Sequence, residues 1–530
     1  MPTKCSGRYP SAHPLLSAAA AMVLASIPTG AFAQSDPSTR DILNILVEKG
    51  VLSRGDADGV LAEARRRTEA AEGTVRAPYV PEAVRDQIRE EVKADVLATA
   101  KSEGWAQPGA LPDWVGKLDI HGDVRVRAEH IAFGKANTPL IYDINAINAD
   151  GGYYVDDVLP LRETTENRFR ARIRARLGFE ARLSDKVDVG FRLATGNLND
   201  PVSANITMSD NFHKLTVGLD RAYIRVRPFA SEGDFAQSNL VFGKFDNPFR
   251  TTELIFDEDI QFEGFAATLD TKLGDSASAP HVRLTAGVFP MEEWDFSNSD
   301  KYLYAAQLGI GGAPLEGFRF NISAGYFDFA NVQGQFNTPG TRDHDHTAAS
   351  RVQFGNSVFN LRNDPGIVNT VLFGLASKFR VGALNAEAEF DLNPTLVGAV
   401  NFEIIKNFGF SRRALTERQV PNSSGDMGWY LRGSIGHAKV TEANAWNFNA
   451  GYRRLEADST LDLFADSDFG LGGTDQKGFV VQGSYGLAKN LWMRGSWYSA
   501  RTINLKDPAT NLVAPPIDTD TVMFDLNARF

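Results

Sequence analysis

The stretch Asp520-Thr-Val-Met-Phe-Asp-Leu-Asn-Ala-Arg-Phe530 alternates in polarity along its whole length. One face is apolar and consists of Val522, Phe524, Leu526, Ala528 and Phe530. The other face carries Thr521, Asp525, Asn527 and Arg529, with Met523 as its one apolar member. A strand of about ten residues with one apolar and one polar face can cross an outer membrane in a closed barrel. The edge strand of a soluble sandwich would alternate in the same way, so the rest of the sequence must separate the two folds.

The beginning of the sequence has the features of an export signal. Lys4 and Arg8 supply positive charge ahead of a short apolar run, and Ala31-Phe-Ala33 places small residues where a signal peptidase inspects them. We therefore expect residues 1–33 to be a signal peptide that is cleaved before Gln34. The apolar run is too short for a permanent membrane helix, which indicates export.

Composition excludes several other classes of protein. The chain has 530 residues and a formal net charge of -11, without basic tracts, so nucleic acid is not an expected partner. No run of about 20 apolar residues follows the signal, which argues against a helical membrane protein. The single cysteine, Cys5, lies inside the signal peptide, so the mature chain should contain neither a disulfide nor a thiolate metal site.

The mature sequence divides into a helical part and a strand part. Residues 34–104 are expected to form a periplasmic helical segment, in which an apolar residue recurs every four positions from Val84 to Val96. Such a stripe fits a solvated helix with one apolar side or a short coiled coil. A linker follows at 105–117, and from residue 118 to residue 530 the period becomes two. We expect an all-β membrane protein, an antiparallel transmembrane barrel preceded by short helices.

Short turns and long polar loops alternate along the strand part, as they do in outer-membrane barrels. The sequence predicts short turns at 183–186, 311–314, 440–445 and 488–490. The predicted external loops lie near 131–165, 198–213, 246–259, 291–300, 330–368, 461–476 and 506–518. The predicted number of strands is about 16 if Leu396–Phe408 belongs to another external loop. Eighteen strands are the alternative, if that segment is part of an added hairpin.

Arginine occupies every second position from Arg168 to Arg176 in the predicted strand Asn167–Leu183. An arginine that faces lipid near the midplane costs about 2–4 kcal/mol, so these side chains are expected to face a water-filled lumen. Neighbouring strands add further arginines, including Arg227, to the same wall. The expected pore-lining residues are Arg125, Arg127, Arg170, Arg172, Arg174, Arg176, Arg192, Arg221 and Arg225.

Several stretches together are similar to the putative porin family of Gram-negative bacteria, over nearly all of the mature sequence. They are Ile45–Leu52, Pro112–Val115, Gly122–Arg127, Arg192–Asn197, Tyr452–Asp458 and Asp466–Phe469. The resemblance implies an outer-membrane barrel with a periplasmic helical preface, in contact with lipid and lipopolysaccharide, and a homotrimer. Phe530 resembles the aromatic carboxy-terminus that the barrel assembly machinery reads in such proteins.

An acidic cluster follows the stretch Val241–Phe249 and consists of Glu253, Asp257, Glu258 and Asp259. In general porins the loop after the fifth strand folds inward and sets acidic residues opposite an arginine wall. By that resemblance, these four residues are expected to form a constriction loop. The alternative is an acidic external loop that binds divalent cations or lipopolysaccharide.

Two further groups of residues could bind metals. Asp343-His-Asp-His346 contains adjacent ligand types, although such a loop is more often only solvated. Asp466, Asp468 and Asp475 could bind calcium at the outer surface. No Ser/His/Asp set is evident, so we expect neither an enzyme nor a cofactor or metal.

The leading interpretation is a passive channel for small hydrophilic solutes or ions, with a weak preference for anions because of the arginines. One alternative is a phosphate-type anion-selective porin, whose layout is similar. Another is an envelope tether or adhesin, in which residues 34–104 bind the cell wall and the long loops bind an external partner.

Overall fold

The computed structural model describes Gly55 and residues 117–530, except 153–159, 209–210, 230–236, 275–278, 296–297, 363–369, 421–422 and 506–513. The expected signal peptide, the expected helical segment apart from Gly55, and the linker up to residue 116 lie outside the described residues. In the part that is described, no helix is both long and apolar enough to cross a membrane.

Sixteen antiparallel strands close into a barrel in the described part of the chain. In order round the barrel they are β1 (Leu118–Phe133), β4 (Arg168–Ser184), β5 (Val187–Thr195), β7 (Val217–Val226), β8 (Gln237–Asp246), β9 (Gln261–Lys272), β10 (His281–Glu292), β11 (Lys301–Leu315), β12 (Phe318–Ala330), β15 (Phe379–Asp391), β16 (Val397–Asn407), β17 (Met427–Gly436), β18 (Trp446–Leu455), β19 (Gln476–Ala488), β20 (Leu491–Thr502) and β21 (Asp518–Arg529). β21 pairs with β1 and closes the sheet. The predicted fold class and the count of 16 are confirmed.

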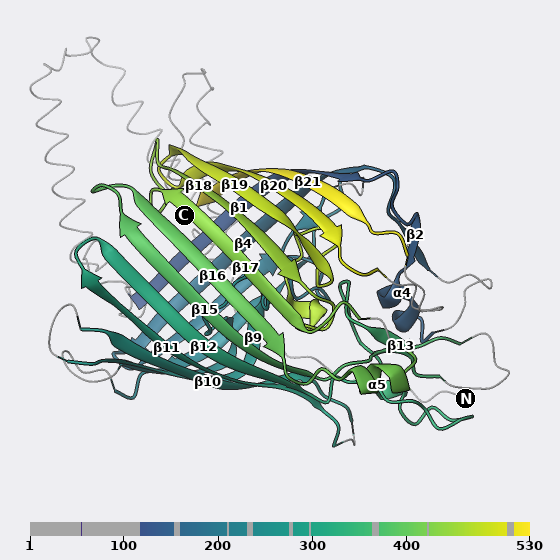
Figure 1. The fold of residues 1–530 in the computed structure, drawn as a ribbon. Helices are drawn as coiled ribbons and strands as arrows, with labels where there is room; N and C mark the ends of the chain where they lie inside the picture. Colours follow the sequence, from purple (N-terminus) through teal and green to yellow (C-terminus); the bar gives the residue numbers. More distant parts are fainter. Residues whose placement is uncertain are drawn as a thin grey trace, which may run out of the picture. The chain divides into compact units, whose positions relative to one another are not determined.

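The connections are long at one end of the barrel and short at the other. The long ones, named loop 1 to loop 8, span 134–167, 196–216, 247–260, 293–300, 331–378, 408–426, 456–475 and 503–517. They contain β2 (Leu140–Tyr142), α4 (Ile144–Ala149), β3 (Leu161–Glu163), β6 (Ile206–Thr207), η2 (Asp345–Thr347), β13 (Val358–Asn360), β14 (Phe373–Leu375), α5 (Arg412–Glu417) and η3 (Asp462–Phe464). α4, β2, β13 and α5 gather at the same end in Figure 1.

The apolar face of each strand lies outside the barrel. In β21, Phe524 is 65% exposed, whereas its neighbour Asp525 is only 4% exposed. A soluble sandwich would bury the apolar face and expose the polar one. The reversed pattern is that of a barrel whose outer wall meets lipid and whose inner wall is polar, so burial decides between the two folds that the alternation left open.

Two predicted connections are wrong. Leu396–Phe408 was expected in an external loop, but it forms β16, in which inward Asn401 and Glu403 alternate with outward Val400 and Phe402. The sixth long connection is loop 6, so the total of 16 strands still holds. Glu403 faces the interior of the barrel, where it accepts a hydrogen bond from the backbone N–H of Thr252 in loop 3.

The turn expected at 311–314 is also displaced. β11 continues to Leu315 through an irregularity in its pairing with β12 after Gly312. The chain reverses at residues 316–317 instead, where Gly317 adopts φ +71°. Glycine adopts such a conformation without the steric cost that a side chain would bring, so it takes the turn.

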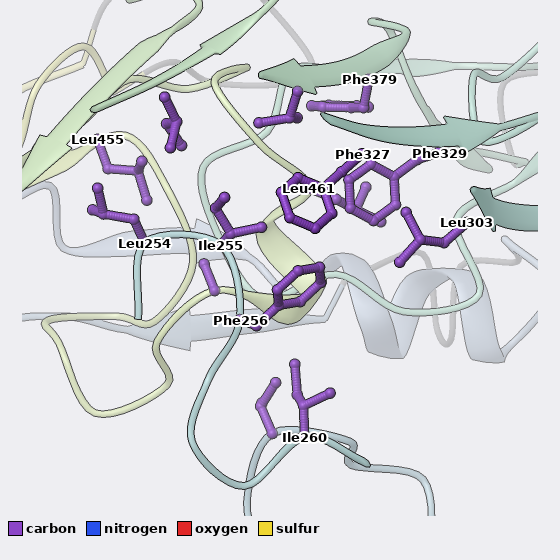
Figure 2. Packing of buried hydrophobic residues seen from close by; sticks show 14 of the residues in the cluster. Leu254, Ile255, Phe256, Ile260, Leu303, Phe327, Phe329, Phe379, Leu455 and Leu461 are labelled. Carbon is purple, nitrogen blue, oxygen red and sulfur yellow. The ribbon is translucent and has the colours of Figure 1, made fainter. Parts of the chain in front are cut away.

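Loops 3, 5 and 7 share an apolar cluster inside the barrel. Leu254 and Ile255 of loop 3 are fully buried, and Phe256 packs against Phe327 of β12 with ring centroids 5.4 Å apart. Figure 2 shows these side chains beside Leu461 of loop 7. Loop 3 is therefore held within the barrel by hydrophobic packing, which is largely proportional to the apolar area removed from water.

Candidate solute pathway inside the barrel

The arginines of β1 and β4 form one wall of the interior. The strand register sets Arg125 opposite Arg174 and Arg127 opposite Arg172. All four side chains point inward, as the sequence predicted, and are largely shielded from solvent. Like charges directly opposite each other on a sheet are destabilising, so this arginine wall requires anionic partners.

Carboxylates on the barrel strands supply many of these partners. Glu129 of β1 is fully buried and accepts hydrogen bonds from Arg170 Nε at 2.5 Å and Arg172 Nη1 at 3.3 Å. The remaining strand pairs are Asp123 with Arg174 and Arg176, Asp525 with Arg127, Asp220 with Arg192, Asp246 with Arg221, and Asp188 with Arg225 and Arg227. Sequence reasoning missed these carboxylates, although Asp123 and Glu129 share the parity of Arg125 in β1.

Two acidic residues of loop 3 contact the arginine wall directly. Asp259 Oδ1 lies 3.1 Å from Arg174 Nη1 and 3.3 Å from Arg176 Nη1. Glu258 Oε1 lies 3.9 Å from Arg125 Nη1, and its side chain is 61% exposed. The expected inward fold of this loop is present, but Asp259 contacts the wall rather than standing across an open lumen from it.

The other two acidic residues of loop 3 face elsewhere. Glu253 Oε1 lies 3.1 Å from Arg432 Nη1, which β17 contributes. Asp257 is buried and accepts a hydrogen bond of 2.8 Å from the backbone N–H of Ser467 in loop 7. The four acidic residues therefore join loop 3 to β1 and β4, to β17, and to loop 7.

Loop 7 supplies two further carboxylates to this region. Asp466 Oδ2 accepts a hydrogen bond of 2.6 Å from Arg453 Nη1, and Asp468 Oδ2 accepts one of 2.8 Å from Arg127 Nη1. The sequence analysis considered calcium binding at the outer surface as one possibility for these two residues. The structure instead places them inside the barrel beside arginines, because loop 7 folds inward with loop 3.

A polar cavity of about 220 Å³ lies between loop 3, loop 7 and the barrel wall. Its arginine and carboxylate lining residues are Arg125, Arg127, Arg432, Arg494, Glu253, Asp257, Glu258, Asp259, Asp466 and Asp468. β1, β17 and β20 supply the arginines, whereas the loops supply every carboxylate named. Ionisable groups of both signs on facing surfaces create a transverse electric field, which low-dielectric walls focus.

Three carboxylates of this polar cavity differ in the direction of their pKa shift. Burial raises the pKa of Asp257 well above its usual range, and the charge of Asp466 adds to the effect. Burial likewise raises the pKa of Asp466 to about 6, although Arg453 opposes the increase. Burial would also raise the pKa of Asp468, but Arg127 and Arg125 lower it to about 2. Asp468 is therefore ionised at neutral pH, whereas Asp257 holds its proton more tightly than an exposed aspartate.

Hydrogen bonds fix loop 3 to the wall at two further points. Gln307 of β11 accepts from the backbone N–H of Arg250 and donates to its carbonyl, both at 2.8 Å. Glu403 of β16 accepts from the backbone N–H of Thr252 at 2.9 Å and from its hydroxyl. These bonds set the path of loop 3 across the interior, and no sequence motif announces them.

Three other aspartates of the two groups that could bind metals are engaged in protein contacts. The Asp343 carboxylate accepts hydrogen bonds from Thr338 and Thr341, and Asp345 binds Arg362 at 2.7 Å. Asp475 accepts from the backbone N–H of Asn504 at 3.1 Å. Across the described residues, no group of three or more His, Cys, Asp or Glu is arranged to hold a metal ion.

Comparison with known proteins adds the family. The family model described as putative porin matches residues 37–530. The chain belongs to this porin family. Comparison with the sequences of curated proteins finds no match.

Several solved structures are similar to this porin. OprB of Pseudomonas putida has a TM-score of 0.42 and 10% identity, covering 78% of this chain and 94% of that one. OmpF of Salmonella typhi, in a complex with daunomycin, has a TM-score of 0.38 and 11% identity, covering 78% and 97%. The outer membrane channel DcaP of Acinetobacter baumannii has a TM-score of 0.38 and 9% identity, also covering 78% and 97%.

Family and fold together locate the porin in the bacterial outer membrane. The closed barrel, its exposed apolar wall and its charged interior are the features that this location requires. The wall meets the outer-membrane lipid, while the polar cavity and the inward loops lie within the barrel.

Proposed function

We propose that this porin is a passive channel for small hydrophilic solutes and ions, with the polar cavity on the permeation path. The observation that carries the proposal is the lining of that cavity, where arginines from the wall face carboxylates from loops 3 and 7. A water-filled interior accommodates this density of charge, whereas an apolar one would not. Passage needs neither an enzymatic step nor a cofactor.

We further propose a weak preference for anions. Arg494 lines the polar cavity and donates to Ser484 at 3.3 Å; among the described residues it forms no ion pair. Asp257 has a raised pKa, so it carries less negative charge at neutral pH than an exposed aspartate would. Carboxylates outnumber arginines in the lining of the polar cavity, so the support for this preference is Arg494 and the arginine wall of β1 and β4 rather than the net charge of the lining.

Planar-bilayer recording of the purified porin in a salt gradient tests both statements. We expect open-channel steps and a reversal potential on the anion side. Replacing Arg170, Arg172 and Arg174 together by glutamine should move the reversal potential toward cations, because Glu129 and its neighbours lose their counter-charges. Arg494→Gln should do the same with less disturbance of the wall.

Arg319→Gln is the matched control. Its guanidinium pairs with Glu389 and Asp391 beside the short turns, away from the polar cavity. The control should leave the reversal potential unchanged. Absence of any conductance would contradict the channel, and an unchanged potential in both cavity variants would contradict the proposed selectivity.

The assembly and the helical part are separate proposals. We propose a homotrimer, by resemblance to the family, and a periplasmic unit at residues 34–104 that is dispensable for conduction. Cross-linking in the membrane would test the first. Deleting residues 34–104 would test the second: a barrel that conducts normally while the envelope loosens would support a tethering role for the deleted part.

A further inference from the structure

A second cavity, of about 280 Å³, lies inside the barrel where loop 3 faces β9, β10 and β11. Phe256 and Ile260 of loop 3 line it, whereas the acidic residues between them line the polar cavity. Its other apolar walls include Phe262 of β9, Phe289 of β10 and Phe464 of loop 7. Loop 3 thus presents charge to one cavity and aromatic rings to the other, which we name the aromatic cavity.

The rings of the aromatic cavity already pack edge to face. The centroid of Phe262 lies 4.9 Å from that of Phe256 and 4.9 Å from that of Phe289, with interplanar angles of 69° and 72°. Met291 also lines the space. Aromatic rings and thioethers favour such contacts with a further ring, so the lining suits a flat aromatic group better than a sugar or an inorganic ion.

Cationic side chains with remaining hydrogen-bond capacity border the aromatic cavity. Lys244 pairs with Glu263 at 2.5 Å, but their side chains are 33% and 59% exposed, so water can replace either partner. Arg351 contacts Asn199 and Asp200, while its Nε is buried without a hydrogen-bond partner. An ammonium has three donors and a guanidinium five, so each can donate hydrogen bonds to a bound carboxylate in addition to its present partners.

The aromatic cavity lies beside the proposed permeation path. A third cavity, of about 240 Å³, shares Asn199, Lys244 and Gln261 with it. That third cavity also shares Asp259 with the polar cavity. The three cavities are therefore neighbours along loop 3 within the same barrel.

We propose that the aromatic cavity binds small aromatic carboxylates, with the ring among Phe256, Phe262 and Phe289 and the carboxylate at Lys244 and Arg351. The inference rests on the proposed channel and deepens it by naming a solute class. An aromatic amine would set its charge against the lysine and arginine, and an aliphatic acid would leave the rings unfilled.

The test combines equilibrium binding of radiolabelled benzoate to the detergent-purified porin with bilayer recording in the presence of benzoate, benzylammonium or acetate. We expect saturable benzoate binding and concentration-dependent interruptions of the current, with little effect of acetate or benzylammonium. Ser350→Trp, at an exposed position lining the cavity, should abolish both signals by filling it. Lys244→Gln should weaken benzoate binding about two- to fivefold, as for a partly exposed ion pair.

Lys406→Gln is the matched control, since Lys406 pairs with Asp426 at 3.0 Å outside the aromatic cavity. It should bind benzoate like the unmodified porin. Normal conductance without benzoate binding, or binding that persists in Ser350→Trp, would overturn the inference and leave the channel intact. Benzoate binding without conductance would overturn the proposed function and retain the site.

Discussion

At the scale of single residues, a buried arginine between two carboxylates from different parts of the chain is the recurring unit of the interior. Arg127 of β1 pairs with Asp525 of β21 at 2.7 Å and with Asp468 of loop 7 at 2.8 Å. It therefore connects the seam of the barrel to an inward loop. The net stabilisation from such a buried ion pair is small, because burial removes the hydration of both ions.

Arg127→Gln should lower the free energy of unfolding by about 3–5 kcal/mol, because Asp525 and Asp468 would remain buried without their counter-ion. Urea unfolding of the barrel in detergent measures the difference. Arg501→Gln is the control, since Arg501 and Asp518 lie 3.5 Å apart with both side chains half exposed; it should cost less than about 1 kcal/mol. Equal losses for the two variants would contradict this account.

At the scale of elements, loop 7 is an inward segment with a polar core. Asp458 and Asp462 are almost fully buried. The Asp458 carboxylate accepts a hydrogen bond from the backbone N–H of Ser357, and the Asp462 carboxylate accepts from other backbone groups. Burial raises the pKa of Asp462 to about 7 and also raises that of Asp458. Each proton is therefore bound more tightly in the folded loop than in an opened one.

The stability of loop 7 should fall as pH rises. Because the folded pKa of Asp462 is raised from 3.8 to about 7, its contribution is complete below the unfolded pKa and is lost as pH rises through the folded one. The loss is about 1.4 kcal/mol per pH unit within that window. Thermal unfolding in detergent should show a lower midpoint at about pH 8 than at about pH 5. Asp462→Asn should reduce this difference, and an undiminished difference would exclude Asp462 as a cause.

Loop 3 is a second element with a testable restraint. Gln307→Ala removes the two hydrogen bonds that hold the backbone of Arg250, which should cost about 1–3 kcal/mol because the freed groups lie inside the barrel. We expect noisier open-channel current, since the loop can shift across the pathway. Asn137→Ala serves as the comparison, because it likewise removes two hydrogen bonds to backbone carbonyls, those of Thr164 and Asp518, and Asn137 does not line the polar cavity. Equal noise in the two variants would argue against Gln307 as a tether.

At the scale of the whole molecule, the first and last strands of the barrel, β1 and β21, pair with each other at one seam. The backbone N–H and carbonyl of Phe530 pair with those of Gly122, both at 3.0 Å. The Phe530 ring covers Gly122 so closely that a Cβ there would lie 2.6 Å from Phe530 Cζ. The final residue thus completes closure of the sheet as well as offering an aromatic side chain to the membrane boundary.

Deleting Phe530 should therefore impair insertion into the outer membrane and lead to periplasmic degradation. Heat-modifiable electrophoretic mobility of outer-membrane fractions measures the folded barrel. Phe530→Tyr, which keeps the backbone pair and the aromatic ring, should assemble normally. A deletion variant that accumulates as folded barrel at the usual level would contradict the role assigned to this residue.

The sequence by itself predicted the barrel, a count of about 16 strands with 18 as the alternative, and an inward direction for the arginines. Those properties follow from a period of two and from the cost of placing arginine in lipid, and both are local. The segment at β16 was misassigned because its place in the count of strands, and not its own alternation, decided the assignment; the long connection is loop 6, which follows it.

Only the tertiary structure decided how the interior is filled. The partners of the arginine wall depend on strand register and on loops 3 and 7, whose inward fold brings Asp466 and Asp468 to arginines instead of to the outer surface. The aromatic cavity likewise combines side chains from four barrel strands and several loops. Alternation fixes which way a side chain points, but the neighbours that it meets depend on closure of the sheet and packing of the loops, which couple residues hundreds of positions apart.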